Sequence, residues 1–129
     1  MAPPRGRRDQ LTPLELEIMT VLWDGGAATV QDVQQRLTRP LAYTTVQTML
    51  NILVRKKRAK RTLVDRSYRY RAAVSREKTA GSALRDLVER MFGGSAEALV
   101  MSLVESSQLT PETLQRLKTL IEKGEERDA

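Results

Sequence analysis

Residues 42–58, AYTTVQTMLNILVRKKR, bring together side chains that can hydrogen-bond to the edges of nucleic-acid bases. At about 100° per residue, the polar residues fall on one side of a helix: Thr44, Gln47, Thr48, Asn51 and Arg55. A Gln or Asn amide can bond adenine in a bidentate way, and Thr offers a hydroxyl and a methyl group for thymine. Solvated helix faces are usually rich in Glu and Lys, which have high helix propensity. Because this face has no acidic residue, the pattern predicts a helix that reads bases.

Basic residues end this stretch and continue into the segment after it. Phosphate contacts give affinity and orientation, whereas contacts with base edges give sequence preference. We predict phosphate contacts from a tyrosine and a set of basic residues: Tyr43, Arg55, Lys56, Lys57, Arg58, Lys60, Arg66 and Arg69. Arg61 and Arg71 add positive charge to the same region.

The net charge of +6 at pH 7 is concentrated in the N-terminal part of the chain. Residues 1–74 contain 14 Lys and Arg against 6 Asp and Glu, whereas residues 75–129 contain 8 against 10. A polyanionic partner is therefore expected for the first part alone.

The composition also limits the chemistry that the chain can perform. It contains no Cys and no His, which removes disulfides, thiol nucleophiles, imidazole bases and the usual ligands of zinc and copper. The acidic pairs Glu15/Glu17 and Glu125/Glu126 are interpreted as solvated helix charge. We therefore expect a non-enzymatic protein with neither a metal site nor a cofactor.

The elements that must position the polar face begin with a helix after residue 12. Thr12 can serve as its N-cap, Pro13 takes the first helical position and Glu15 completes a capping box. This helix carries two apolar stripes. The first consists of Leu14, Ile18, Val21 and Leu22, and the second consists of Leu16, Met19 and Trp23. A helix that is apolar on two sides is expected to be central, and Gly25-Gly26 ends it.

Two more helices and a hairpin follow. Thr29 caps a short helix with an apolar inner face: Val30, Val33 and Leu37. After Pro40, the helix that carries the polar face has a core-facing side: Val46, Met49, Leu50, Leu53 and Val54. Residues 60–72 alternate aromatic and basic side chains around a turn near Asp65-Arg66, which predicts a β-hairpin with an aromatic inner face. This order is typical of a winged helix-turn-helix domain over residues 11–74, with its third helix in the major groove.

RNA binding and a basic protein-interaction module are alternatives to DNA binding. RNA readers usually display aromatic stacking platforms, but Trp23, Tyr68 and Tyr70 are predicted to lie in the core. RNA binding is therefore disfavoured. A further alternative is a basic architectural protein that coats DNA without sequence preference. The uncharged face on residues 44–51 argues against it, because coating does not require base-reading side chains.

Residues 75–123 return to helical spacing and predict a mainly α chain. Their apolar residues exceed what three short helices bury alone, so we expect them to pair with a second copy of the chain rather than to pack back on the first domain. The predicted dimer interface consists of Leu84, Leu87, Val88, Met91, Phe92, Leu99, Val100, Leu103, Val104, Leu114, Leu117 and Ile121. Residues 124–129, GEERDA, are expected to form a disordered tail.

Residues 1–10 contain Pro, Gly and basic residues and are expected to form a flexible arm. They have no apolar segment behind them, as a secretory signal would require. The sequence has no run of about 18 apolar residues that could span a membrane. We therefore expect a cytoplasmic protein without membrane insertion.

Four stretches resemble the penicillinase repressor family of bacterial regulators: LTPLELEIMTVLW at 11–23, LAYTTVQTMLNIL at 41–53, SYRYRA at 67–72 and MFGGSAEALV at 91–100. The resemblance implies a winged-helix repressor whose C-terminal helices form a homodimer on palindromic operators. It also implies base contacts from Thr44, Thr45, Gln47 and Thr48. Many members of the family are inactivated when a membrane-bound, β-lactam-sensing metalloprotease, or proteolysis that it triggers, cuts the repressor in its dimerisation region. Alignment puts that cut between Ser102 and Leu103.

The sequence departs from the family at some of these positions. Thr44 and Gln47 stand where penicillinase repressors carry basic residues, so a different half-site is expected. Ser102-Leu103 replaces the Asn-Phe pair of the cleaved members. Copper-responsive relatives have a Cys-rich C-terminal motif, which this chain lacks.

Overall fold

The computed structural model describes residues 10–128, so most of the arm predicted at residues 1–10 lies outside the described residues. Its internal contacts divide the chain into two units, with the boundary between Leu84 and Arg85. None of the described helices is long and apolar enough to cross a membrane.

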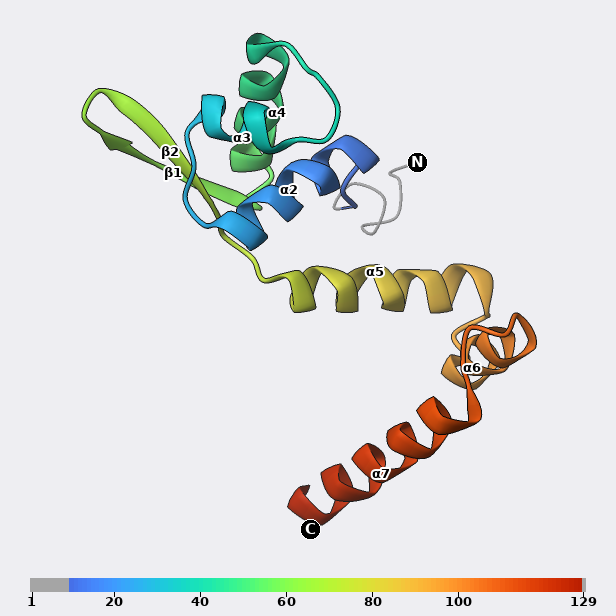
Figure 1. Cartoon of the computed structure of the whole chain (residues 1–129). Coiled ribbons are helices and arrows are strands. Elements are labelled where there is room, and N and C mark those ends of the chain that lie inside the picture. Colours follow the sequence, from blue (N-terminus) through green and yellow to red (C-terminus); the bar gives the residue numbers. More distant parts are fainter. Residues whose placement is uncertain (1–9, 129) are drawn as a thin grey trace. The chain divides into compact units, whose positions relative to one another are not determined.

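The first unit contains three complete helices and a β-hairpin, followed by the start of α5 (Arg76–Met91) (Figure 1). The helices are α2 (Pro13–Gly25), α3 (Val30–Arg36) and α4 (Tyr43–Arg55), and the hairpin strands are β1 (Ala59–Val64) and β2 (Ser67–Ala72). This order confirms the predicted winged helix-turn-helix within a mainly α chain. The hairpin extends away from the three helices, with its turn at the far end (Figure 1).

Two reciprocal capping boxes define where α2 and α3 begin. The hydroxyl of Thr12 accepts a hydrogen bond from the backbone N–H of Glu15, and the Glu15 carboxylate accepts one from the backbone N–H of Thr12. Thr29 and Asp32 make the same pair of bonds at the start of α3. Gly26 ends α2 with a φ of 73°, a conformation that glycine adopts without steric cost. These caps confirm the predicted helix starts.

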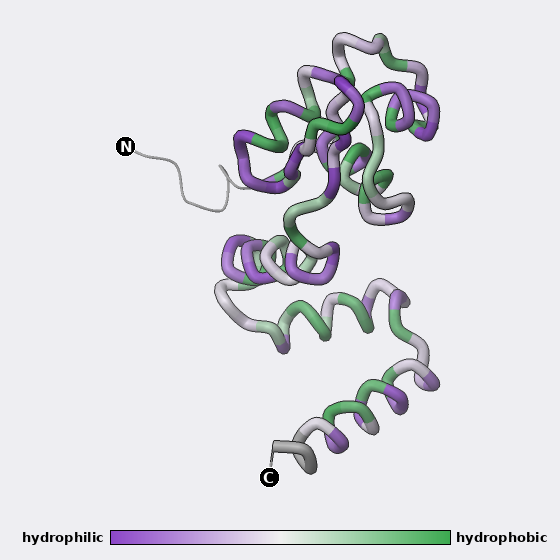
Figure 2. The backbone as a smooth tube through the Cα atoms, turned by 90° about the vertical axis from the view of Figure 1, so that its left-hand side faces the viewer, coloured by the Kyte–Doolittle hydropathy of each residue, from purple (hydrophilic) through white to green (hydrophobic). Residues whose placement is uncertain are grey.

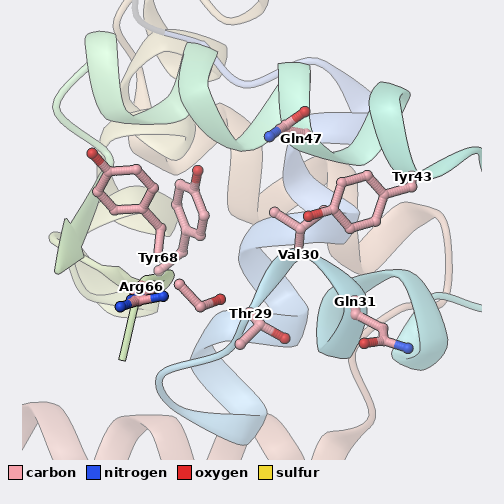
Figure 3. Close-up of a pocket in the computed structure, with 9 residues that line it drawn as sticks. Thr29, Val30, Gln31, Tyr43, Gln47, Arg66 and Tyr68 are labelled. Carbon is pink, nitrogen blue, oxygen red and sulfur yellow. The ribbon is translucent and has the colours of Figure 1, made fainter. Parts of the chain in front are cut away.

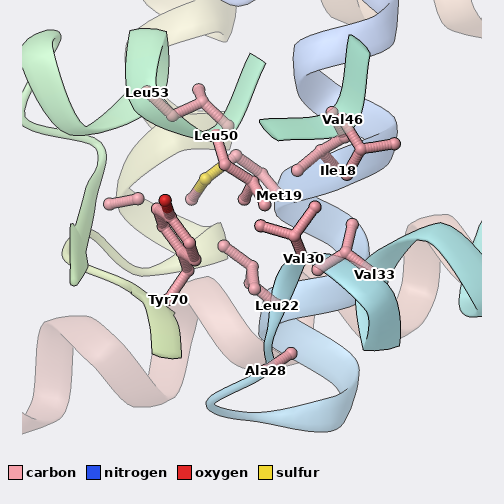
Figure 4. Packing of buried hydrophobic residues seen from close by; sticks show 11 residues of the cluster. Ile18, Met19, Leu22, Ala28, Val30, Val33, Val46, Leu50, Leu53 and Tyr70 are labelled. Carbon is pink, nitrogen blue, oxygen red and sulfur yellow. The ribbon is translucent and has the colours of Figure 1, made fainter. Parts of the chain in front are cut away.

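One apolar cluster holds the three helices and the hairpin together (Figure 4). It consists of Ile18, Met19, Leu22, Ala28, Val30, Val33, Val46, Leu50, Leu53, Ala59 and Tyr70, all buried. The predicted second stripe of α2 is only partly buried. Met19 is inside, Trp23 is half-buried with its Nε1 donating to the carbonyl of Val74 at 2.9 Å, and Leu16 is 45% exposed. In the first stripe Ile18 and Leu22 are buried, whereas Leu14 and Val21 are half-buried against the core. The expectation that α2 is central therefore holds for the buried residues of both stripes and only in part for the rest.

The hairpin closes through a two-residue turn at Asp65-Arg66, as predicted. Both residues have positive φ, 49° and 69°, which suits the right-handed twist of the flanking strands. Backbone bonds between Ala28 and Tyr70, at 2.9 and 2.7 Å, attach β2 to the loop before α3. The predicted aromatic inner face was wrong in part. Tyr70 is 1% exposed, but Tyr68 is 42% exposed because it lies nearer the turn, beyond the reach of the helical core.

The second unit contains the end of α5 (Arg76–Met91) together with α6 (Ala96–Glu105) and α7 (Pro111–Asp128). Ser95 caps α6 by accepting a hydrogen bond from the N–H of Ala98 at 3.0 Å, as predicted. Hydrophobic residues recur along α7 between hydrophilic ones (Figure 2). The predicted disordered tail was wrong as far as Asp128, where α7 ends. Glu, Lys and Arg favour helix there, and Gly124 costs only about 1 kcal/mol. Ala129 lies outside the described residues.

Candidate nucleic-acid interface

The outer face of α4 displays uncharged polar side chains at its N-terminal end. Thr44, Thr45, Gln47 and Thr48 are all exposed. The opposite side of the helix is fixed by Val46, Leu50 and Leu53, each fully buried. Because these anchors leave α4 no freedom to rotate about its axis, the four polar side chains are held on the outside as a set. This arrangement is what base reading in a groove requires.

Asn51 behaves differently from the rest of the predicted base-reading face. It is half-buried, and its Oδ1 accepts hydrogen bonds from the hydroxyl of Tyr70 at 2.9 Å and from Nη1 of Arg61 at 3.0 Å. An amide oxygen has two lone pairs, and both are used here. The side chain of Asn51 therefore contacts the hairpin, whereas Thr44, Gln47 and Thr48 on the same predicted face are exposed.

A pocket opens between α4, the start of α3 and the hairpin (Figure 3). Its lining is mostly polar and consists of Thr29, Val30, Gln31, Tyr43, Gln47, Arg66, Ser67, Tyr68 and Tyr70. Gln47 and Tyr43 lie one turn apart on α4, and Arg66 and Tyr68 come from the hairpin. The pocket thus joins a predicted base reader to two predicted phosphate contacts. Thr29 was predicted only as a helix cap, and Gln31 and Ser67 were missed because nothing in the local pattern marks them.

Most of the predicted phosphate contacts have exposed side chains. Tyr43 is 47% exposed, and five basic residues are also exposed: Arg55, Lys57, Lys60, Arg66 and Arg69. Arg58 is half-buried. Arg61 is exposed as well, but its guanidinium lies 4.3 Å from the centre of the Tyr68 ring and donates a hydrogen bond to Asn51. The exposed basic residues run from the end of α4 along the hairpin, next to the predicted base-reading face.

Lys56, which was predicted to contact phosphate, is exposed, and its Nζ forms an ion pair with a buried carboxylate. It lies 2.8 Å from Oε2 and 2.9 Å from Oε1 of Glu15, which is 1% exposed. The interpretation of Glu15 as solvated charge was therefore wrong. A buried carboxylate needs a cation and hydrogen bonds, and Lys56 and Thr12 supply them. Neither sequence position indicates the other, because the partners are 41 residues apart.

Burial and hydrogen bonding act in opposite directions on the carboxylate of Glu15. Burial alone raises its pKa, but hydrogen bonds from Lys56 and Thr12 and the charge of Lys56 outweigh it, so the pKa lies below 4.5. The pKa of Asp32 is lowered as well, first of all by the hydrogen bond from the backbone of Thr29. The positive charge of Arg69 on the hairpin acts in the same direction on Asp32. Both carboxylates are thus ionised near neutral pH.

Metal chemistry gains no support from the part of the chain that the structure describes. Residues 10–128 contain no group of three or more Asp and Glu side chains that could hold a metal ion.

Comparison with known proteins identifies the family. The model of the penicillinase repressor family matches residues 11–123. A penicillinase repressor of Bacillus licheniformis is 23% identical over 120 residues, which cover 92% of this chain and 94% of that relative. The YusO protein of Bacillus subtilis is 18% identical, with a TM-score of 0.51 over 93% of this chain and 78% of its own, and shows likeness of fold alone. A further similar structure is the monomeric form of BlaI from Bacillus licheniformis in complex with the blaP half-operator. It is 27% identical, with a TM-score of 0.47, and the match covers 53% of this chain and 85% of the BlaI chain. Since the family model extends from α2 to α7, this chain belongs to the penicillinase repressor family.

Proposed function

We propose that this chain is a transcriptional repressor that binds operator DNA as a homodimer, with α4 in the major groove and the hairpin along the neighbouring backbone. The observation that carries the proposal is the exposed, uncharged face of α4, held outward by three buried residues and bordered by basic side chains. Membership of the penicillinase repressor family supports a DNA-binding repressor. A DNA ligand also agrees with the cytoplasmic location predicted from the sequence.

In this proposal Thr44, Thr45, Gln47 and Thr48 read base edges. Backbone phosphates are bound by Tyr43, Arg55, Lys57, Arg58, Lys60, Arg66 and Arg69. Their division into an uncharged centre and a basic border supports sequence-specific binding over general coating, because phosphate contacts alone carry no sequence information.

The homodimer is supported by apolar surface on the C-terminal helices. All described side chains of α5 and α6 are at least partly exposed. Among the predicted interface residues of the second unit, Met91 is 71% and Ile121 is 63% exposed. Residues such as these are normally covered in a folded protein, and a second copy presents the matching surface. A two-fold dimer in turn requires a palindromic operator with fixed spacing between its half-sites.

Release from the operator is proposed to follow a cut between Ser102 and Leu103 by a membrane-bound sensor metalloprotease, or by proteolysis it triggers, in response to β-lactam or cell-wall stress. Both residues lie half-buried inside α6. The carbonyl of Ser102 accepts a hydrogen bond from the N–H of Ser106 at 3.0 Å. A protease therefore reaches this bond only after α6 opens locally. A cut would divide the helix that carries four predicted interface residues, and the separated monomers would then leave the DNA by mass action.

Selection of duplexes from a random library by the full-length chain tests the proposal directly. We expect the recovered sequences to share an inverted repeat whose half-sites are one helical turn apart, about 34–36 Å, or a multiple of it. Recovery of sequences without a shared motif would contradict sequence-specific repression and would favour a DNA-coating protein.

A further inference from the structure

We infer that Asn51 is a positioning residue: its amide oxygen fixes the hairpin relative to α4, so that the hairpin reaches phosphate while the first turns of α4 reach bases. The inference rests on the proposed function and adds to it a residue that acts inside the protein. It follows from one cluster of side chains, the Asn51 cluster, which consists of Asn51, Arg61, Tyr68 and Tyr70.

The chemistry of the Asn51 cluster determines which end of the amide faces the hairpin. Arg61 has donors only, so the atom of Asn51 that it contacts must be the oxygen. The hydroxyl of Tyr70 then donates to the same oxygen at 2.9 Å. A bidentate bond with adenine requires both the oxygen and the NH2 group of an Asn. Since the oxygen is already bonded twice, Asn51 is not available for that contact.

The cluster extends from α4 to the outer part of the hairpin. The Arg61 guanidinium lies 4.3 Å from the centre of the Tyr68 ring, and the rings of Tyr68 and Tyr70 are 6.5 Å apart and tilted by 56°. Tyr70 is also bonded through its backbone to Ala28, at the start of the helix-turn-helix. Both strands of the hairpin are thereby tied to the helices: β1 through Arg61 and β2 through Tyr70.

The position of Asn51 on α4 connects the Asn51 cluster with the pocket in Figure 3. Asn51 lies one helical turn after Gln47, and residues at this spacing are neighbours on a helix surface. Gln47 lines the pocket from α4, whereas Arg66 and Tyr68 line it from the hairpin. The Asn51 cluster therefore sets the separation between a proposed base reader and a proposed phosphate contact.

Three substitutions in the full-length chain separate positioning from base reading. Asn51→Ala removes the acceptor, Tyr70→Phe removes one donor but keeps the buried ring, and Asn51→Asp keeps an oxygen acceptor but loses the NH2 group. Affinity would be measured for the selected duplex and for a random duplex over a range of salt concentrations. Gln47→Ala serves as the matched control, since it alters an exposed side chain on the same helix.

We expect Asn51→Ala and Tyr70→Phe to weaken binding to both duplexes by a similar factor. The slope of log K against log salt should fall by about 0.9 for each phosphate contact that the hairpin loses. Asn51→Asp should keep the wild-type slope, although its added charge weakens binding to both duplexes. Gln47→Ala should weaken binding to the selected duplex alone. If Asn51→Ala and Asn51→Asp both reduce affinity only for the selected duplex, Asn51 is a base reader and the inference is overturned.

Hydrogen exchange in the free protein tests the cluster without DNA. The amides of residues 60–70 should exchange faster in Asn51→Ala and Tyr70→Phe than in the wild type and should regain protection in Asn51→Asp. The amides of α2 should be unchanged, which shows that the variants are folded. Unchanged exchange in the hairpin of both variants would overturn the inference even if the wild type selects an operator. A protein that selects no operator but shows the expected exchange would contradict the proposed function and leave the positioning role supported.

Discussion

The Nζ atom of Lys56, at the C-cap of α4, lies 2.8 Å from Oε2 of Glu15 in the first turn of α2. The carboxylate is 1% exposed and also accepts a hydrogen bond from the backbone N–H of Thr12 at 2.8 Å. A single side chain thus completes the cap of the first helix and contacts the far end of the helix that carries the proposed reading face. The two helices are coupled in stability as a result.

Removal of the lysine should destabilise the fold. We expect Lys56→Ala to lower the free energy of unfolding by about 1–3 kcal/mol, because it leaves a buried carboxylate without its cation. Lys60→Ala, which removes an exposed lysine from the adjacent strand, should change it by less than about 0.5 kcal/mol. Urea unfolding of both variants measures the difference, and equal effects would show that the Glu15–Lys56 pair contributes nothing.

The same pair predicts how stability depends on pH. Because the pKa of Glu15 in the folded protein is below its ordinary value of 4.5, the contribution to stability is present above that value. It is lost as the pH falls through the lower pKa of the folded state. Unfolding of wild type and Glu15→Gln between about pH 2 and 6 should show a smaller loss of stability towards acid in the variant. A loss of equal size in the variant would mean that other carboxylates, such as Asp32, account for the dependence.

Base reading and phosphate binding should respond differently to substitution. Gln47→Ala should cost about 1–3 kcal/mol on operator DNA and little on a random duplex. Arg66→Ala should weaken binding to both and lower the salt slope by about 0.9. Fluorescence anisotropy titrations with both duplexes measure these effects. An equal loss on both duplexes for Gln47→Ala would remove this residue from the base-reading set.

The proposed dimer should depend on the exposed apolar residues of α7. We expect the wild type to sediment as a dimer at micromolar concentration and Ile121→Glu to sediment as a monomer. Lys123→Glu, two residues away and also exposed, should remain a dimer. The monomer should bind a full operator far more weakly, because contact with the second half-site is no longer intramolecular. A monomeric wild type would contradict the proposed assembly.

Proteolytic release should be visible in cells. After exposure to a β-lactam, blotting should show a fragment that ends near Ser102 at the time when the target genes are expressed. The cut should be faster in Ile121→Glu, because loss of the partner makes local opening of α6 easier. An intact chain alongside expressed target genes would show that release follows another route.

Features set by neighbouring residues were predictable from the sequence, and features set by distant residues were not. The capping boxes at Thr12 and Thr29 depend on residues three positions apart, and both were predicted. The Asp65-Arg66 turn follows from the alternation on either side of it. Local pattern could not reveal that Lys56 bonds with Glu15, because that contact exists only once α2 and α4 have packed together.

The candidate site follows the same division. Periodicity correctly placed Thr44, Gln47 and Thr48 on the outside of α4, because the buried side of a helix determines the exposed one. The helical wheel could not distinguish Asn51 from these residues. The hairpin residues that donate hydrogen bonds to its side chain belong to an element that begins eight positions later in the chain. Tyr68 was misplaced for a related reason, because alternation indicates which face of a strand a residue is on but not where the core beneath it ends.

The turn at the tip of the hairpin has a consequence for attempts to engineer a more stable repressor. Arg66 has a φ of 69°, a backbone conformation that costs a residue with a side chain about 1 kcal/mol relative to glycine. Any design method that optimises folding alone will therefore choose Asn-Gly for this turn, the pair that such hairpins favour. That choice would remove the guanidinium from the outermost point of the proposed DNA-binding surface. A substitution at residue 66 that raises thermostability is thus expected to lower operator affinity. A library that varies residue 66 should therefore be screened for both properties.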